Sequence, residues 1–155
     1  MRTIDTPRWL TADQQQVWRT YLGATNRVRQ HLDNELRQFD LDLAEYEILV
    51  RLSEAHCRAI RMSELAEQVG QSRSRLTHTV TRLEAKGLLS RGSCPDDRRG
   101  VLAVLTDEGY AFLEKVAPYH VASVRELLVD PVDPEDFTTL GRVMSRVLEA
   151  ELPQD

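Results

Sequence analysis

Residues 63–105 read SELAEQVGQSRSRLTHTVTRLEAKGLLSRGSCPDDRRGVLAVL, and this stretch decides the fold. It predicts a short helix over 63–69 that ends at Gly70, because glycine tolerates the left-handed conformation at a helix C-terminus. Ser72 is a good N-cap for a second helix, expected over 73–86. The stretch therefore begins with two helices joined by a tight turn.

The second half of the stretch predicts a β-hairpin. Two short apolar runs, 88–91 and 101–105, read as strands. Between them, residues 92–100 carry glycine at both ends together with Pro95, which is typical of a hairpin loop. The predicted fold class is mainly α with a small β-hairpin, in the order helix, turn, helix, hairpin.

The second of these helices is expected to present a basic, hydroxyl-rich outer face. Leu76, Val80 and Leu83 share its inner face at 100° per residue. The outer side and N-terminus have no acid before Glu84. Arginine suits guanine edges, and serine, threonine and histidine suit phosphates or base edges, so this helix can lie in a DNA major groove. The alternative is an ordinary surface helix, although such helices usually mix acids with bases. The candidate DNA contacts are Ser72, Arg73, Ser74, Arg75, Thr77, His78, Thr81 and Arg82.

The tip of the hairpin adds Asp97, Arg98 and Arg99 to the candidate DNA contacts. An exposed hairpin that ends in two arginines can place a guanidinium in a narrow minor groove, and the aspartate can hold one arginine in a fixed rotamer. Without the neighbouring helix, a plain solvated turn would be the better interpretation of this loop.

The charge distribution agrees with a local nucleic-acid surface. The chain carries a net charge of −5, which taken alone argues against nucleic acid. Residues 58–100, however, hold nine basic and five acidic side chains, a net +4, so the rest of the chain carries −9. Such asymmetry is typical of a localised phosphate-binding face.

The remaining sequence predicts further helices. A capping box at Thr11 opens a helix expected over 12–39, about 40 Å long. A single apolar stripe on so long a helix requires a large packing partner, often a second subunit. Another helix is expected after Asp42, followed by a polar loop over 54–60.

Two helices are expected after the hairpin. The first is capped by residues 106–108, runs to about residue 128 and should bend at Pro118. The second is capped by Asp133, with Pro134 at its first position.

Several classes of protein are excluded by what the sequence lacks. Its apolar runs are too short to span a bilayer, and the first residues lack the apolar region of a signal peptide. Only Cys57 and Cys94 occur, too few for a secreted disulfide scaffold, so a cytoplasmic protein is expected. The sequence contains no catalytic, dinucleotide-binding or metal-binding motif, so we expect no enzyme, cofactor or metal site.

The sequence resembles the MarR family of winged helix-turn-helix regulators. Residues 97–109, DRRGVLAVLTDEG, are similar to the family's wing signature, with Ala103 where valine is more usual. Ala66, Gly70 and Leu76 have the spacing of the family's helix-turn-helix motif. The long first helix and the two C-terminal helices extend the resemblance over nearly the whole chain.

This resemblance implies a homodimer that binds a pseudo-palindromic DNA operator. An intertwined helical dimerisation region is implied for residues 1–39 and 107–155, and a DNA-binding domain for residues 40–106. Residues 72–82 would form the recognition helix, and Asp97 and Arg99 the acid–arginine pair of the wing. Most members of the family repress transcription, and many are released by small aromatic or phenolic ligands.

The candidate effector-binding residues are Trp18, Tyr21 and Tyr46, although core or interface packing would also explain each aromatic side chain. A cysteine-based redox regulator is one alternative function, since Cys94 lies near three arginines that can lower a thiol pKa. A winged-helix protein-interaction module without DNA binding is another. It would more often show exposed apolar anchors where this chain carries arginine.

Overall fold

The computed structural model describes residues 7–94 and 97–151, and within this range the side chains of residues 94 and 97–99 are not described. The chain forms two compact units. Unit 1 comprises residues 1–30 and 123–155, and unit 2 comprises residues 31–122. The expected dimerisation region, residues 1–39 and 107–155, and DNA-binding domain, residues 40–106, have different limits from these units and remain a prediction.

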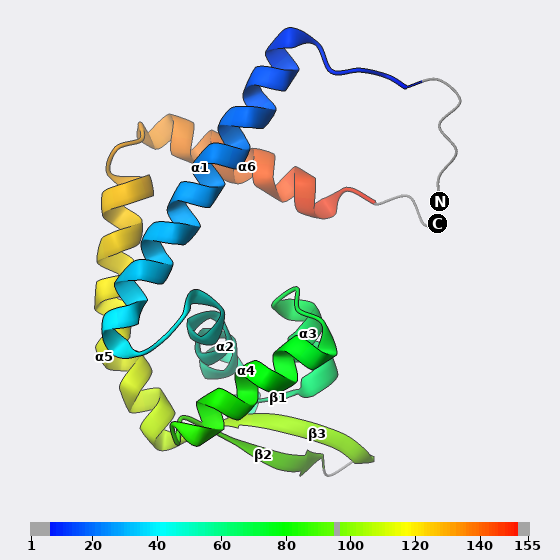
Figure 1. Ribbon diagram of the computed structural model, residues 1–155, viewed down its shortest axis with the longest axis vertical. Helices are drawn as coiled ribbons and strands as arrows, with labels where there is room; N and C mark the ends of the chain where they lie inside the picture. The colour runs from blue at the N-terminus through cyan, green and yellow to red at the C-terminus, as the bar shows by residue number, and fades with distance from the viewer. Residues whose placement is uncertain (1–6, 95–96, 152–155) are drawn as a thin grey trace. The chain divides into compact units, whose positions relative to one another are not determined.

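Helices account for most of the chain (Figure 1). Several of them begin at the predicted caps. The helices are α1 Ala12–Leu36, α2 Leu43–Glu54, α3 Met62–Gln68, α4 Arg73–Ala85, α5 Asp107–Val124 and α6 Pro134–Glu149. The backbone N–H of Gln14 donates to Oγ1 of Thr11 (3.2 Å) and that of Thr11 to Oε1 of Gln14 (3.0 Å), which confirms the capping box. Asp133 caps α6 and Pro134 opens it, as predicted.

Short irregular helices lie at the ends of α1, α2 and α5. The 3-10 helix η1, Arg37–Phe39, continues α1, and η2, His56–Arg58, follows α2. The helix α5 runs through Pro118 and passes into a π-helix, η3, Arg125–Val129. The predicted ends of the first and fifth helices, at about residues 39 and 128, therefore fall in segments of a different helix type.

The sheet has three antiparallel strands in the order β1–β3–β2, so the predicted hairpin is one strand short of the observed sheet. The strands are β1 Ala59–Arg61, β2 Leu89–Cys94 and β3 Asp97–Leu105. The prediction of a polar loop over 54–60 was wrong at its C-terminal end. Residues 59 and 60 belong to β1, which pairs with β3 at Ile60↔Ala103. The two hairpin strands also extend further towards the tip than predicted, because backbone hydrogen bonding does not require apolar side chains.

The core lies in unit 2, where α2, α3 and α4 pack on one another and on the sheet. Leu49, Leu65, Leu76 and Val80 are wholly buried. Ala103 is also wholly buried, on the central strand between Ile60 and Arg91. A helix-turn-helix followed by a paired β2–β3 wing defines unit 2 as a winged helix-turn-helix, which confirms the predicted fold class.

Candidate nucleic-acid interface

The turn between α3 and α4 has the geometry that the sequence predicted. Gly70 has φ +61°, and its N–H donates to the carbonyl of Glu67, while the N–H of Gln71 donates to the carbonyl of Ala66. These two bonds satisfy the last carbonyls of α3 in the pattern of a Schellman motif. Oγ of Ser72 accepts from the N–H of Arg75 (3.3 Å) and caps α4. Local hydrogen bonds therefore fix the angle at which the recognition helix leaves the turn.

The outer face of α4 is exposed as predicted, and its inner face is buried. Leu76, Val80 and Leu83 are wholly buried, and Thr79 is nearly so. The predicted DNA contacts on this helix are all exposed, namely Ser72, Arg73, Ser74, Arg75, Thr77, His78, Thr81 and Arg82. The structure thus presents these eight side chains on α4 and its N-cap, with Glu84 as the only acid of α4.

Two of the exposed hydroxyls are already bound to the helix backbone. Oγ1 of Thr77 donates to the carbonyl of Arg73, and Oγ1 of Thr81 donates to the carbonyl of Thr77, each at 2.8 Å. A hydroxyl that has donated its proton retains lone pairs that accept hydrogen bonds. These threonines are therefore better placed to accept from a base amino group than to donate to a phosphate.

Arg91, on β2, joins the wing to the recognition helix. Its guanidinium forms an ion pair with Glu84 and donates to Oγ1 of Thr81 (2.9 Å) and to the carbonyl of Thr77 (3.3 Å). This contact was not predicted from the sequence, although the lone acid on a basic helix was a signal for it. Because Arg91 pairs with Glu84 and neutralises its charge, this carboxylate does not repel DNA from the outer face of α4.

The wing is the β2–β3 hairpin, whose backbone is paired from Leu89↔Leu105 to Ser93↔Val101. The predicted wing contacts Asp97, Arg98 and Arg99 have side chains outside the described residues, as does Cys94. The hairpin backbone therefore supports a projecting wing, while the roles of these side chains remain predictions.

Two hollows border the recognition helix within unit 2. One, of about 380 Å³, is lined by Asp42, Ala44, Ser74, Arg75, His78, Thr79 and Arg82. The other, of about 400 Å³, is lined by Arg61, Met62, Ser63, Arg73, Thr77, Gly100 and Val101. Arginines from α4 therefore line a hollow on each side of the helix, facing α2 on one side and the wing on the other.

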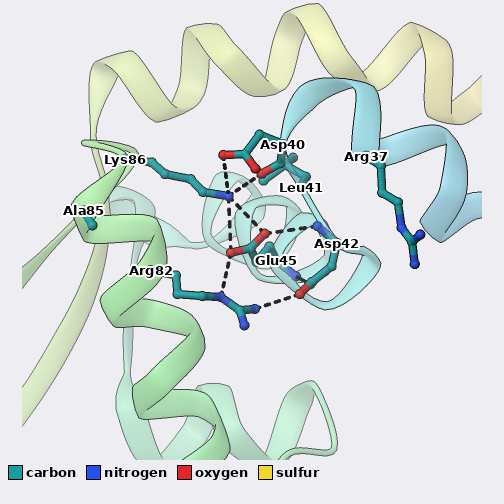
Figure 2. A pocket seen from close by; sticks show the side chains of 8 residues that line it. All are labelled: Arg37, Asp40, Leu41, Asp42, Glu45, Arg82, Ala85 and Lys86. Atoms are coloured by element: carbon teal, nitrogen blue, oxygen red, sulfur yellow. Dashed lines mark hydrogen bonds and ion pairs between the residues drawn. The ribbon is translucent and has the colours of Figure 1, made fainter.

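A third hollow, of about 630 Å³, lies where α4 ends beside the segment that joins α1 to α2 (Figure 2). Its charged lining includes Glu45, whose carboxylate is bound by Arg82 and Lys86. Helical periodicity placed Arg82 on the DNA-facing side. Its pairing with Glu45 was not predicted, because it joins residues far apart in the chain.

The candidate effector residues lie in different units. In unit 1, Trp18 and Tyr21 stack with ring centroids 5.7 Å apart and remain partly exposed. In unit 2, Tyr46 is buried and lies against the ring of His120, with centroids 4.3 Å apart. Burial raises the pKa of the Tyr46 hydroxyl and lowers the pKa of His120.

Few other groups in the described residues suggest ligand chemistry. No cluster of three or more potential metal ligands is found among them. Cys57 is an exposed free thiol in η2. None of the described helices is long and apolar enough to cross a lipid bilayer.

The helix-turn-helix, its basic outer face and the wing define the class of winged-helix DNA-binding proteins. The sequence model of the MarR family matches residues 41–101 of this chain. The chain is 34% identical over 131 residues to the HTH-type transcriptional regulator PecS of Dickeya dadantii, covering 81% of this chain and 78% of PecS. The chain belongs to the MarR family, as the sequence resemblance indicated.

Solved structures agree with this assignment. The MarR family regulator AbsC of Streptomyces coelicolor is 45% identical, with a TM-score of 0.87 over 92% of this chain and 97% of AbsC. Sco3205 of Streptomyces coelicolor, a MarR family regulator solved in complex with DNA, is also 45% identical, with a TM-score of 0.90 over 97% of this chain and 95% of Sco3205. The chain is therefore a DNA-binding transcriptional regulator of a non-enzymatic family.

Proposed function

We propose that the chain acts as a homodimeric repressor that binds a pseudo-palindromic operator. The observation that carries the proposal is the exposed apolar surface of unit 1. The described residues of this unit contain no buried apolar side chain, whereas an apolar stripe follows α6. Large exposed apolar patches mark interaction surfaces, and closed dimers are the commonest way to cover them. The stripe consists of Phe137, Leu140, Val143 and Val147.

In each protomer, α4 would enter a major groove. Arg73, Arg75 and His78 are exposed on its N-terminal half, which reads base edges in helix-turn-helix proteins. Ser72 and Ser74 would add phosphate or base-edge contacts, and Thr77 and Thr81 would accept hydrogen bonds from base edges. The wing would bring Asp97, Arg98 and Arg99 to the adjacent minor groove. The related Sco3205 was solved in complex with DNA, which supports DNA binding by this chain.

The experiment is binding to the DNA upstream of the chain's own gene at several salt concentrations, with scrambled DNA of equal length as the control. Selective binding with a steep salt slope is expected, because phosphate contacts release counterions. Arg99→Ala should weaken binding without unfolding the dimer. Equal affinity for the upstream DNA and the scrambled DNA would argue against operator binding at this site. If selection from a random DNA pool also gave no preferred sequence, operator binding would be rejected and a protein-interaction module favoured.

Repression itself is tested separately in cells. A reporter placed behind the bound DNA should be more active when the gene for this chain is deleted. Reduced reporter activity after deletion would show an activator and contradict the repressor assignment.

We further propose that a small aromatic or phenolic effector releases the DNA. The exposed, stacked pair of Trp18 and Tyr21 supports this, since aromatic rings prefer stacked or edge-to-face partners. A compound that releases the operator should change the fluorescence of Trp18, measured in a Trp9→Phe variant. Release without any such change would exclude Trp18 from the effector site.

A further inference from the structure

The guanidinium of Arg82 is bound to α2 rather than free on the outer face of the recognition helix. Its Nε donates to Oε1 of Glu45 (3.1 Å), and its Nη2 donates to Oδ2 of Asp42 (2.7 Å). Figure 2 shows both bonds leaving one guanidinium towards two carboxylates. An arginine that reads guanine needs two such donors for O6 and N7. In Arg82, the donors on this edge of the guanidinium are already occupied.

The carboxylate of Glu45 is the centre of this arrangement. Its side chain is only 4% exposed, and it accepts from the backbone N–H of Asp42 (3.0 Å) as well as from Arg82. Nζ of Lys86 lies 3.3 Å from its second oxygen. A buried carboxylate requires partners of this kind, because an unpaired buried charge is strongly unfavourable. One side chain of α2 thus binds two cations about one helical turn apart, Arg82 on α4 and Lys86 at its C-cap.

Further contacts hold the same end of α4. Lys86 also pairs with Asp40 (3.4 Å), in the segment before α2. On the wing side, Arg91 binds Glu84 and Thr81. The C-terminal half of the recognition helix is therefore held from α2 and from β2. By contrast, Arg73 and Arg75, at its N-terminal end, belong to no ion pair found among the described residues.

We propose that Arg82 is a positioning residue, which sets the recognition helix for the operator through Glu45 and Asp42 instead of reading a base. This inference rests on the proposed operator binding and divides α4 into two parts. The N-terminal half, with Arg75, contacts DNA. The C-terminal half is held in place by its ion cluster, and this determines how the N-terminal half enters the groove.

The test compares Arg82→Ala, Glu45→Gln and the double variant with the wild-type protein. Glutamine preserves the capping box of α2, because it occupies the same position in natural capping boxes, so Glu45→Gln should fold. The matched control is Arg75→Ala, which removes an arginine of the same helix that lies outside the ion cluster. Each protein binds an operator selected from a random DNA pool and scrambled DNA of equal length, across a salt series.

For a positioning residue, Arg82→Ala and Glu45→Gln should each weaken operator binding by about tenfold, and the double variant should be little worse than either, since coupled contacts are not additive. Binding to scrambled DNA and the salt slope should stay near the wild-type values. A loss of folded protein would lower binding to both DNAs equally, so the ratio of the two affinities separates positioning from instability. Arg75→Ala should instead change the salt slope or the preferred base.

Two outcomes would overturn the inference. A phosphate contact at Arg82 would lower the salt slope by about 0.9 in Arg82→Ala, and Arg82→Lys would restore it. A base contact would confine the loss to one operator base pair and add fully to the effect of Glu45→Gln. Under positioning, Arg82→Lys fails like alanine, because an ammonium cannot bridge two carboxylates in the same fork geometry.

Amide hydrogen exchange tests the same inference without DNA. Both Arg82→Ala and Glu45→Gln should speed exchange over residues 81–86, whereas Arg75→Ala should not. If the wild-type protein shows no operator preference, the proposed function fails, and this measurement still decides on the ion cluster. Unchanged exchange over these residues would show that Arg82 does not hold the helix.

Discussion

The two compact units differ in how completely they bury their apolar side chains. In unit 2, Leu49, Leu76 and Val80 are wholly inaccessible to solvent. In the described part of unit 1, no apolar side chain is buried, and Leu148 is 87% exposed. One unit thus completes its core within a single chain, whereas the other has amphipathic helices whose apolar faces require another surface.

This difference separates two kinds of stability in one molecule. Burying a large apolar side chain contributes about 1.5–3 kcal/mol, which unit 2 gains by folding alone. In the proposed dimer, unit 1 would gain the same contribution by association, so its stability should depend on protein concentration. The comparison predicts which substitutions act on assembly and which act on the fold of the chain.

The largest effect is expected from Leu140→Asp, in the apolar stripe of α6. A twofold interface contains each substitution twice, and a carboxylate buried there without a partner is strongly unfavourable, so about 3–6 kcal/mol of association energy is lost. The dissociation constant of the dimer should rise roughly 10²- to 10⁴-fold, as measured by sedimentation over a range of concentrations. Unit 2 should keep its unfolding transition.

The matched control for this experiment is Arg142→Glu, an exposed polar position on the same helix. It should leave the dimer nearly unchanged, since isolated surface charges contribute little. A monomeric wild-type protein at micromolar concentration, or a dimer unaffected by Leu140→Asp, would contradict the assignment of α6 to an interface.

Elements of both units that depend on near neighbours in sequence could be predicted. Gly70 and Ser72 fix the turn by bonds that span only a few residues, and Thr11 and Asp133 cap their helices in the same local way. The inner face of α4 followed from helical periodicity. Composition also indicated its exposed basic face, because a helix without acids is unusual on a surface.

Elements that depend on distant partners could not be predicted. The strand β1 has only three residues, and its partner β3 lies about forty positions later in the chain. The bond between Arg82 and Glu45 joins positions 37 residues apart, so it depends on how α2 packs against α4. Sequence pattern placed Arg82 on an exposed face correctly but could not show what its guanidinium binds.

A second test uses the same substitution, glycine to alanine, in each unit. In unit 2, a Cβ on Gly109 would lie 2.1 Å from the carbonyl oxygen of Leu88. That oxygen already accepts from the N–H and Oγ1 of Thr106, which holds it in place. Gly109→Ala should therefore destabilise unit 2 by about 1–3 kcal/mol, measured by urea unfolding. This contact gives a physical reason for glycine at position 109, the last residue of the segment that resembles the wing signature.

In unit 1, Gly23→Ala should have the opposite sign. Gly23 is in the middle of α1, and apart from its chain neighbours and the nearby backbone of the helix, no atom of the described residues lies within 4 Å of a Cβ built on it. Alanine restricts the unfolded chain and favours the helix, so a gain of about 0.5–1 kcal/mol is expected. A destabilised Gly23→Ala protein would show that α1 is closely covered at this position in the dimer.

The smallest effect concerns pH and reports on unit 2 alone, because all four histidines lie there. Burial lowers the pKa of His120 below its usual 6.5, and its Nδ1 has no hydrogen-bond partner among the described residues. Tyr46, which faces it, has a raised pKa and stays neutral in this range. The unfolded chain therefore binds the proton more readily than the folded chain, and stability present at neutral pH should be lost as the pH falls through about 6.5.

His120→Phe keeps a ring against Tyr46 and removes the titrating group. Urea unfolding at about pH 8 and about pH 6, both above the isoelectric point near 5.4, should show a smaller loss of stability in this variant than in the wild-type protein. The control is His56→Asn, at an exposed histidine of the same unit, which should retain the wild-type loss. An equal loss of unfolding free energy in the wild-type and His120→Phe proteins would mean that another group in unit 2 binds the proton. The acid sensitivity of this unit would then not depend on the burial of His120.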